Sequence, residues 1–413
     1  MGWIAALTVV FLSLCLVRLT VPAHAYFDEV HYLPSARALL DLSHLANPEH
    51  PPLGKLLIAV GIALFGNGPL GWRAAPVLLG AIGFLGAMRS MWFATFSRFA
   101  TLTFGVLLAT SFLFFVHARI AMLDGIMVSF LLIALWMCAG ALRENETARC
   151  RLAIAGTALG LAMAAKWNAA PLAVLPGLAF LVVRARSRRW NFATTSRGPP
   201  IRGMSLLEAA VWLGLLPLAV YTASYIPYAF LADGAVHPTG LIELHREMLA
   251  LQKQVVGTHT YQSVWYDWAL NRRAIWYLYE PVDGIQRGIM LIGNPLTMLV
   301  GLPAMVWCVW TGVKRKRPDA FAIAVLYAVS LGLWVVVAKP VQFYYHYLLP
   351  SVFLMAALAL ALDEFWQRRK HGIPLLVLGG SVTLFAYFWP IISAASLAGP
   401  DAFLRWTWLD SWR

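Results

Sequence analysis

Two adjacent carboxylic acids, Asp28 and Glu29, follow the long apolar run that opens the chain. Acidic side chains beside a membrane are costly unless water solvates them or the protein uses them. A carboxylate in this position can take the proton of an attacking hydroxyl and act as a general base. The other interpretation is a hydrated pair of loop carboxylates, and these two residues alone do not decide between the two.

Cationic side chains appear at later breaks in the apolar sequence. Arg119 and Asp124 stand five residues apart between two apolar segments, and Lys166 interrupts another. Arg119 and Lys166 could simply extend to the membrane surface, and Asp124 could cap a helix end. Alternatively, since lysine and arginine bind phosphate, they predict a positively charged pocket at the lipid interface. The other members of that pocket would be His50, Lys55 and Arg73.

A carboxylate base next to cations suits transfer of a group from a lipid-phosphate carrier to an acceptor hydroxyl. The base would take the acceptor's proton, and the cations would stabilise the phosphate as it leaves with the bonding electrons. The sequence has no Gly-rich Walker loop, no Gly-x-Ser-x-Gly and no His-Glu-x-x-His. Nucleotide hydrolases, serine hydrolases and zinc proteases therefore lack their signatures here. The four cysteines show no Cys-x-x-Cys spacing, so we expect no disulfide.

The elements that hold these residues must be membrane helices. The chain has 413 residues, of which 60% are hydrophobic and 12% charged, with a mean hydropathy of +0.69. A spanning helix needs about 20 mostly apolar residues, and such stretches recur almost from end to end. We predict eleven spans near residues 2–22, 72–92, 100–117, 121–142, 152–165, 169–184, 206–232, 285–312, 319–338, 347–362 and 372–395. A soluble enzyme with one anchor is excluded.

The basic residues predict which connections face the cytoplasm. Short cytoplasmic loops are enriched in Lys and Arg, and 18 of the 32 such residues fall in alternate connections, six of them between 184 and 202. This holds only if residues 51–65, an apolar stretch that contains Lys55, do not cross the membrane. We therefore predict an interfacial or re-entrant helix there, with the N-terminus inside and the C-terminus outside. Residues 1–413 would form one membrane domain, with large outside loops at 23–71 and 233–284.

Ala23-His24-Ala25 also fits a signal-peptidase site after the first apolar run. That alternative would remove the first segment. We keep it as a span because it has no basic start and because the acidic pair follows it directly.

The order of the motifs resembles that of the dolichyl-phosphate-mannose protein mannosyltransferases, a family of phospholipid carrier-dependent GT-C glycosyltransferases. The resemblance rests on Phe27-Asp28-Glu29-x-His31, on His50-Pro51-Pro52-Leu53-Gly54-Lys55, on Arg119 to Asp124 and on Lys166-Trp167. It continues in Thr258-His259-Thr260-Tyr261-Gln262-Ser263-x-Trp265 and in Gly293-Asn294-Pro295. It implies a GT-C fold in which the first outside loop forms short juxtamembrane helices over the active site.

By this resemblance Asp28 would be the catalytic base and Glu29 its structural or acceptor-binding neighbour. His50, Lys55, Arg119 and Lys166 would lie near the donor's phosphate and sugar, and Asp124 would support the cavity. His259, Tyr261 and Asn294 belong to the motifs of the later loops. The resemblance also implies inversion of the anomeric centre, and the family's protein-modifying members are not regarded as needing a metal. His346, in the aromatic run Phe343-Tyr344-Tyr345-His346-Tyr347, is a further candidate for donor or sugar contact, although such aromatic runs also form interfacial belts.

The sequence departs from the family in two places. It has His259-Thr260-Tyr261 where the family commonly has His-Pro-Tyr, and it lacks the large lumenal insert of the eukaryotic enzymes. The second departure indicates a bacterial type, located in the inner membrane with its site on the periplasmic side.

The leading hypothesis is transfer of mannose, or a similar hexose, from a polyprenyl phosphate to Ser or Thr of a secreted protein. The partners would be the lipid-linked donor, a protein or lipid-glycan acceptor and membrane lipids, without nucleic acid. A close alternative moves a sugar such as aminoarabinose onto a lipid glycan, with Glu49 as a possible metal or donor ligand. A transporter or flippase is a third possibility, but it predicts repeats and broken helices near the middle of the bilayer.

Overall fold

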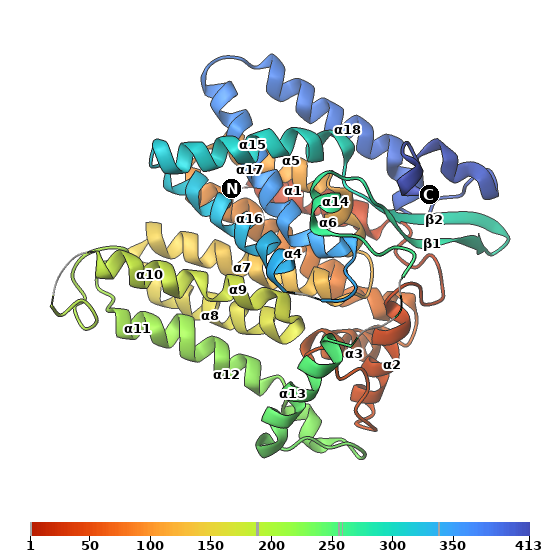
Figure 1. Cartoon of the computed structure of the whole chain (residues 1–413), viewed down its shortest axis with the longest axis horizontal. Helices are drawn as coiled ribbons and strands as arrows, with labels where there is room; N and C mark the ends of the chain where they lie inside the picture. The colour runs from red at the N-terminus through yellow and green to blue at the C-terminus, as the bar shows by residue number, and fades with distance from the viewer. Residues whose placement is uncertain (1, 187–189, 255–256, 258, 338) are drawn as a thin grey trace.

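The protein is a bundle of helices with one small hairpin at its edge (Figure 1). The computed structural model describes residues 2–186, 190–254, 257, 259–337 and 339–413. Arg188 and Arg189 of the basic cluster and Thr258 of the later motif lie outside these residues.

The longer helices follow the apolar stretches of the sequence. They are α1 (Gly2–Leu16), α4 (Pro69–Thr95), α5 (Arg98–Ala109), α7 (Leu123–Arg143), α8 (Ala148–Ala165), α10 (Leu175–Ala185), α15 (Pro295–Lys314), α16 (Pro318–Val336), α17 (Leu348–Gln367) and α18 (Gly372–Ile392). Several begin where the sequence provides a start signal. Pro69 and Pro318 occupy the first turns of α4 and α16, and the Ser97 hydroxyl accepts a hydrogen bond from the backbone amide of Ala100 in α5.

Shorter elements connect or extend these helices. They are α2 (Glu29–Leu40), α3 (Leu53–Phe65), α6 (Phe112–His117), α9 (Ala170–Ala173), α11 (Leu206–Ala210), α12 (Leu216–Ala223), α13 (Leu241–Gln252), α14 (Trp265–Ala269), β1 (Ile275–Val282) and β2 (Ile285–Leu291). A π-helical turn at Val211–Leu215 joins α11 to α12.

The chain is an integral membrane protein. Within the described ranges, nine helical segments are long and apolar enough to cross a bilayer. Each of the eleven predicted spans has a helical counterpart. The two that fall short of the length are α1 with 15 residues and α5 with 12, although α6 continues α5 after a break at Thr110 and Ser111.

One predicted span begins in the wrong place. Residues 285–291, expected to open a helix, instead form β2, which pairs antiparallel with β1, and the helix begins at Pro295. The two residues between the strands, Asp283 and Gly284, have φ angles of 53° and 74°. This left-handed backbone suits a two-residue hairpin turn and the Asp-Gly pair that builds it. The apolar run after the turn does not by itself distinguish a strand from the start of a helix.

The segment 23–71 contains two short helices, as expected. At about 1.5 Å per residue the 13 residues of α3 reach about 20 Å, less than the roughly 30 Å of a hydrocarbon core. Helix α3 packs against α2 and α4. Its length therefore agrees with an interfacial or re-entrant helix and does not support a span.

Helix α17 lies at the centre of the bundle, packed against α5, α15 and α16, while α7 packs against α4 and α8. Figure 1 shows the β1–β2 hairpin, α2, α3 and α13 towards one side of the bundle, and α10 and α11 reaching to the opposite side. The hairpin side also holds the C-terminus, where the indole of Trp276 in β1 donates to the Trp412 carbonyl oxygen at 3.1 Å. The candidate residues from the first loop lie on this side.

Candidate active site

A cavity of about 280 Å³ opens beside Asp28, the residue that precedes α2. Three segments far apart in the sequence form its wall: residues 28–50, the end of α13, and the connection between α16 and α17. The lining residues are Asp28, His31, Tyr32, Asn47, Glu49, His50, Leu251, Gln252, Gln254, Lys339, Pro340, Val341 and Tyr345. The cavity thus places a carboxylate, histidines and a lysine around one space.

The Asp28 carboxyl group has an unusual proton affinity for an aspartate. Burial raises its pKa to about 6 and nearby Asp124 adds to this rise, while Lys166, His31 and Lys339 oppose it. The group is therefore ionised at neutral pH, yet it holds a proton more readily than an exposed carboxylate. This combination suits a general base.

Behind the cavity, Lys166 and Asp124 form a buried ion pair. The Lys166 ammonium, which follows α8, donates to the Asp124 carboxylate in the first turn of α7 at 2.6 Å. The ammonium also lies 5.2 Å from the centre of the Tyr345 ring. Tyr345 lines the cavity, and both charges of the pair act on the pKa of Asp28. The Lys166–Asp124 pair therefore contributes to the electrostatic environment of the cavity.

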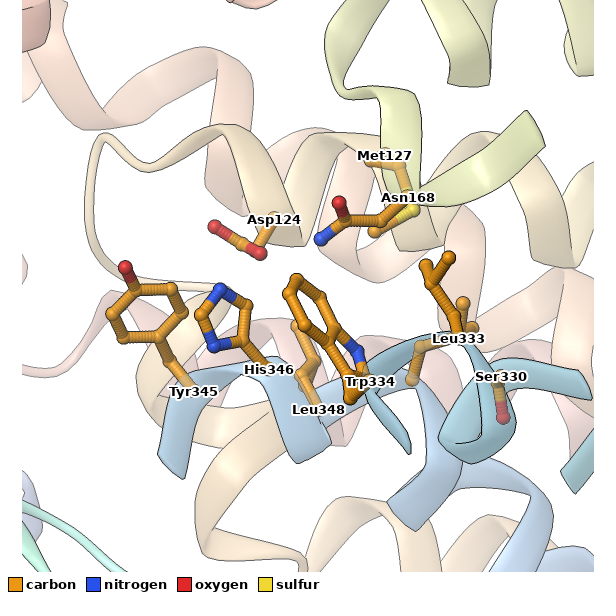
Figure 2. A pocket seen from close by; sticks show the side chains of 10 residues that line it. Asp124, Met127, Asn168, Ser330, Leu333, Trp334, Tyr345, His346 and Leu348 are labelled. Carbon is orange, nitrogen blue, oxygen red and sulfur yellow. The ribbon is translucent and has the colours of Figure 1, made fainter. Parts of the chain in front are cut away.

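A second, smaller pocket adjoins the ion pair, and Figure 2 shows Asp124 and the Asn168 amide on one side of it, facing the rings of His346 and Trp334. The ring centres of these two residues are 3.7 Å apart. The Nδ1 atom of His346 lies 2.9 Å from the Phe343 carbonyl oxygen. His346 therefore has one nitrogen held by the backbone, and its ring faces the ion pair through this pocket.

Glu29 has a different environment from Asp28 although the two are neighbours. Its two carboxylate oxygens each accept a hydrogen bond from Arg73 of α4 at 2.8 Å, and both side chains are 0% exposed. The Ala121 amide donates to the same carboxylate at 3.0 Å. Arg73 also donates to the Leu19 carbonyl oxygen. This network joins the segment before α2 to the bundle, and it occupies both carboxylate oxygens of Glu29.

The structure places Arg119 away from the cavity. Its guanidinium donates to the carbonyl oxygens of Cys15, at 3.0 Å, and Val17, where α1 ends. Cations commonly satisfy the last carbonyls of a helix in this way. Arg119 lines a different, small pocket between the ends of α1 and α18. The described contacts therefore do not bring it to Asp28.

Lys55 lies beneath the wall and does not line the cavity. Its ammonium donates to the carbonyl oxygens of Asn47 and His50 at 2.6 and 3.0 Å, and its side chain is fully buried. It therefore holds the 47–50 turn that carries Glu49 and His50 to the cavity. Burial lowers the pKa of His50 well below its ordinary value, and nearby Lys166 and Lys55 add to this effect, so His50 is neutral at neutral pH.

The later motif residues lie beside the cavity or far from it. The His259 ring packs edge-on against Phe343 at 5.0 Å, and its Nδ1 accepts from the Tyr261 amide at 3.2 Å. These residues brace the connection between α16 and α17. Asn294 is buried at the start of α15 and donates to the Ser381 carbonyl oxygen at 3.0 Å. Asn294 thus joins two helices, and the structure does not bring it to the cavity.

A metal site does not stand out in the geometry. Over the ranges that the structure describes, no three His, Cys, Asp or Glu side chains converge in a way that could hold a metal ion. The Glu49 carboxylate, considered as a metal or donor ligand, accepts a hydrogen bond from the Asn47 amide at 2.9 Å.

Three family models match the chain one after another. Two models described as dolichyl-phosphate-mannose-protein mannosyltransferase match residues 5–75 and 49–196, and the C-terminal four-transmembrane region of protein O-mannosyltransferase matches residues 238–412. The chain belongs to the dolichyl-phosphate-mannose-protein mannosyltransferase family.

Characterised relatives in this family match over almost their whole length. The polyprenol-phosphate-mannose–protein mannosyltransferase of Mycolicibacterium smegmatis is 27% identical over 94% of this chain and 87% of its own. The protein of the same name from Mycobacterium tuberculosis is 26% identical over 100% of this chain and 91% of its own. The one from Corynebacterium glutamicum is 24% identical over 94% and 88%.

Solved structures show the GT-C fold expected of the family. The Saccharomyces cerevisiae protein O-mannosyltransferase Pmt1-Pmt2 complex bound to the sugar donor aligns with a TM-score of 0.81 at 13% identity, covering 99% of this chain and 92% of that one. ArnT from Cupriavidus metallidurans bound to undecaprenyl phosphate aligns with a TM-score of 0.58 at 19% identity, covering 90% and 63%.

Residues from two segments line the cavity although the sequence did not single them out. Gln252 and Gln254 reach the cavity from α13 and the residues that follow it. Their place is fixed by a hydrogen bond of 3.0 Å from the Gln252 amide to the Glu49 carbonyl oxygen, which no sequence pattern reveals. Lys339 was also missed, although a signal existed: it is the only charged residue between Asp319 and Asp363.

Proposed function

We propose that this membrane enzyme transfers mannose from a polyprenyl-phosphate carrier to a hydroxyl group of a Ser or Thr residue in a protein. The observation that carries the proposal is the Asp28 carboxylate, which lines a cavity at the hairpin side of the bundle with its pKa raised to about 6. The names of the family and of the bacterial relatives support the donor and the protein acceptor.

In the proposed reaction, the acceptor oxygen attacks the anomeric carbon of the lipid-linked mannose while Asp28 takes the hydroxyl proton. A bond forms between the acceptor oxygen and that carbon. The bond from the carbon to the phosphate oxygen breaks, and its electron pair stays on the phosphate, which leaves as polyprenyl phosphate. Attack opposite to the leaving group inverts the anomeric centre. General-base catalysis of this kind contributes about 10² to 10⁴ in rate.

The remaining cavity residues would position the two substrates. The Lys166–Asp124 pair is a fixed, buried dipole behind Asp28, and such preorganised charge favours a reaction that develops charge. His346 and Asn168, which face the small pocket next to this pair, are placed for contacts with sugar hydroxyls. His50 offers a neutral ring at the opposite wall.

The protein is proposed to reside in a bacterial inner membrane with this cavity on the periplasmic side. The excess of basic residues in the connections at the opposite side of the bundle supports this orientation. The acceptor would then be a secreted protein. A reporter that is active only outside the cytoplasm, fused at Lys316, should remain inactive, whereas activity there would reverse the orientation.

The decisive experiment uses purified protein in lipid vesicles with labelled polyprenyl-phosphate-mannose and a Ser/Thr peptide. We expect label in the peptide from the wild type, and a rate about 10² to 10⁴ lower from Asp28→Asn. Asp41→Asn is the matched control, because Asp41 is an exposed carboxylate at the end of the same helix. Label in a lipid glycan and none in the peptide would replace the protein acceptor with the alternative one.

A further inference from the structure

Four cations that the sequence suggested for the donor phosphate have protein partners in the structure. Arg73 is paired with Glu29, and Arg119 with the end of α1. Lys55 donates to two backbone carbonyl oxygens. Lys166 is neutralised by Asp124 at 2.6 Å. A donor phosphate carries a negative charge that needs a cation, and these four already have strong interactions elsewhere.

Lys339 is different. It lines the same cavity as Asp28, and none of the acidic side chains in the described part of the chain forms an ion pair with it. Burial lowers the pKa of the Lys339 ammonium to about 8. Nearby Lys166 also lowers this pKa, whereas the carboxylates of Asp124 and Asp28 raise it, so the ammonium is electrostatically coupled to the cavity. Lys339 is therefore mostly charged at neutral pH. Lys339 is partly buried, and an unpaired ammonium that has lost part of its water is costly unless an anion joins it.

The position of Lys339 in the fold supplies the second argument. It follows the end of α16, where Val335, Val336 and Val337 are 54%, 82% and 46% exposed. Helix α16 is one of the candidate spans, and these three valines expose apolar surface at its end. A prenyl chain in the membrane can pack against such apolar surface. Lys339 thus lies between an apolar surface for the chain and the cavity that holds Asp28.

We propose that Lys339 binds the phosphate of the polyprenyl-linked donor and stabilises it as the leaving group. This inference rests on the proposed function and names the cation at its phosphate position. The donor is a phosphodiester with one negative charge. When the bond between sugar carbon and phosphate oxygen breaks, the electron pair remains on the phosphate and the product carries a second negative charge. An ammonium at this oxygen is stabilising in the transition state because it meets the added charge.

Lys166 then has a separate part in the same site. Its ammonium is held by Asp124 below the cavity and contacts the face of Tyr345, so its charge orients Asp28 and the sugar end of the donor. Lys339 comes from the connection between α16 and α17, which also carries Tyr345. The two lysines influence each other, since each carries a positive charge and Lys166 lowers the pKa of Lys339. A bound phosphate between them removes this repulsion.

The test measures donor and acceptor separately. Lys339→Gln should lower the turnover of polyprenyl-phosphate-mannose by about 10² to 10³. It should also raise the donor KM and the inhibition constant of polyprenyl phosphate at least about tenfold, the change expected from about 1.4 kcal/mol of lost phosphate binding. The peptide KM should stay unchanged. Lys339→Arg should recover most of the donor affinity. Arg246→Gln is the control, because Arg246 is an exposed cation on α13 that pairs with exposed Glu243 on the same helix.

Binding of polyprenyl phosphate to the full-length protein, measured by native mass spectrometry, tests the same assignment without turnover. Weaker binding to Lys339→Gln, with normal binding to Lys339→Arg and to Arg246→Gln, supports it. Unchanged donor KM and unchanged polyprenyl-phosphate binding in Lys339→Gln overturn it, as does an equal loss for the donor and the peptide. A wild-type protein that binds polyprenyl phosphate through Lys339 but never transfers mannose would instead contradict the proposed function.

Discussion

The ammonium of Lys166 lies 2.6 Å from the carboxylate of Asp124, and the two side chains are only 6% and 3% exposed. They come from the end of α8 and the start of α7, two helices that pack against each other along the bundle. Their pairing fixes the relative position of these helix ends directly behind Asp28. The chemistry of the cavity therefore depends on a contact between residues that are 42 positions apart in the chain.

Breaking this pair on one side should destabilise the protein. Lys166→Met leaves the Asp124 carboxylate buried without a counter-charge, and such changes cost about 3–5 kcal/mol. The measurement is the free energy of unfolding in detergent by chemical denaturation. The double variant Lys166→Met with Asp124→Asn should recover part of the loss, since no buried charge is then left alone. If the double variant loses the sum of the two single losses, the residues do not act as a pair.

Glu29→Gln should act on folding, in contrast to Asp28→Asn. Arg73 would remain buried and charged with a neutral partner, so we expect a loss of about 3–5 kcal/mol in stability. Thermal unfolding compares the two variants directly: Glu29→Gln should unfold at a clearly lower temperature than wild type, and Asp28→Asn should not. A stable Glu29→Gln protein with no activity would move Glu29 from a structural to a catalytic role.

The rate should depend on pH through Asp28. Its pKa is raised to about 6, so the carboxylate is protonated and unable to accept a proton below that pH. We expect kcat/KM to rise with pH through about 6. Because the phosphate-binding role proposed for Lys339 needs its ammonium, and its pKa is about 8, kcat/KM should fall again above that pH. The folded state favours the protonated form, so stability falls as the pH rises from the unfolded pKa of this carboxyl group through its folded pKa of about 6, and the loss is complete above that pH. Asp28→Asn should accordingly raise the melting temperature at pH 8 and have little effect on it at pH 4.

Arg119→Gln should separate a structural from a donor-binding role. The change removes the charge and the donors that hold the Cys15 and Val17 carbonyl oxygens at the end of α1. Buried polar groups left without a partner cost about 1–3 kcal/mol, so the protein should become less stable. The donor KM should stay at the wild-type value. A raised donor KM at unchanged stability would show that Arg119 binds the donor phosphate.

Much of the site was visible in the sequence because the relevant residues stand in apolar surroundings. Asp28, Lys166 and His50 are polar residues beside stretches that must cross or touch a membrane, and hydrophobic length and basic loops indicate which side each one faces. The short α3 followed from the same reasoning. The hairpin at residues 275–291 did not, because an apolar run after a turn fits a strand and a helix equally well.

The sequence by itself determined the membrane class, the series of helices and a small set of polar residues able to handle a proton and a phosphate. Only the tertiary structure decided which of these residues line the cavity and which hold other parts of the fold together. It committed Glu29 to Arg73, Arg119 to the end of α1 and Lys55 to a backbone turn, and it brought Lys339 to Asp28. The physical reason is that a charge in a dense interior needs a partner, and which partner it meets depends on how distant helices pack.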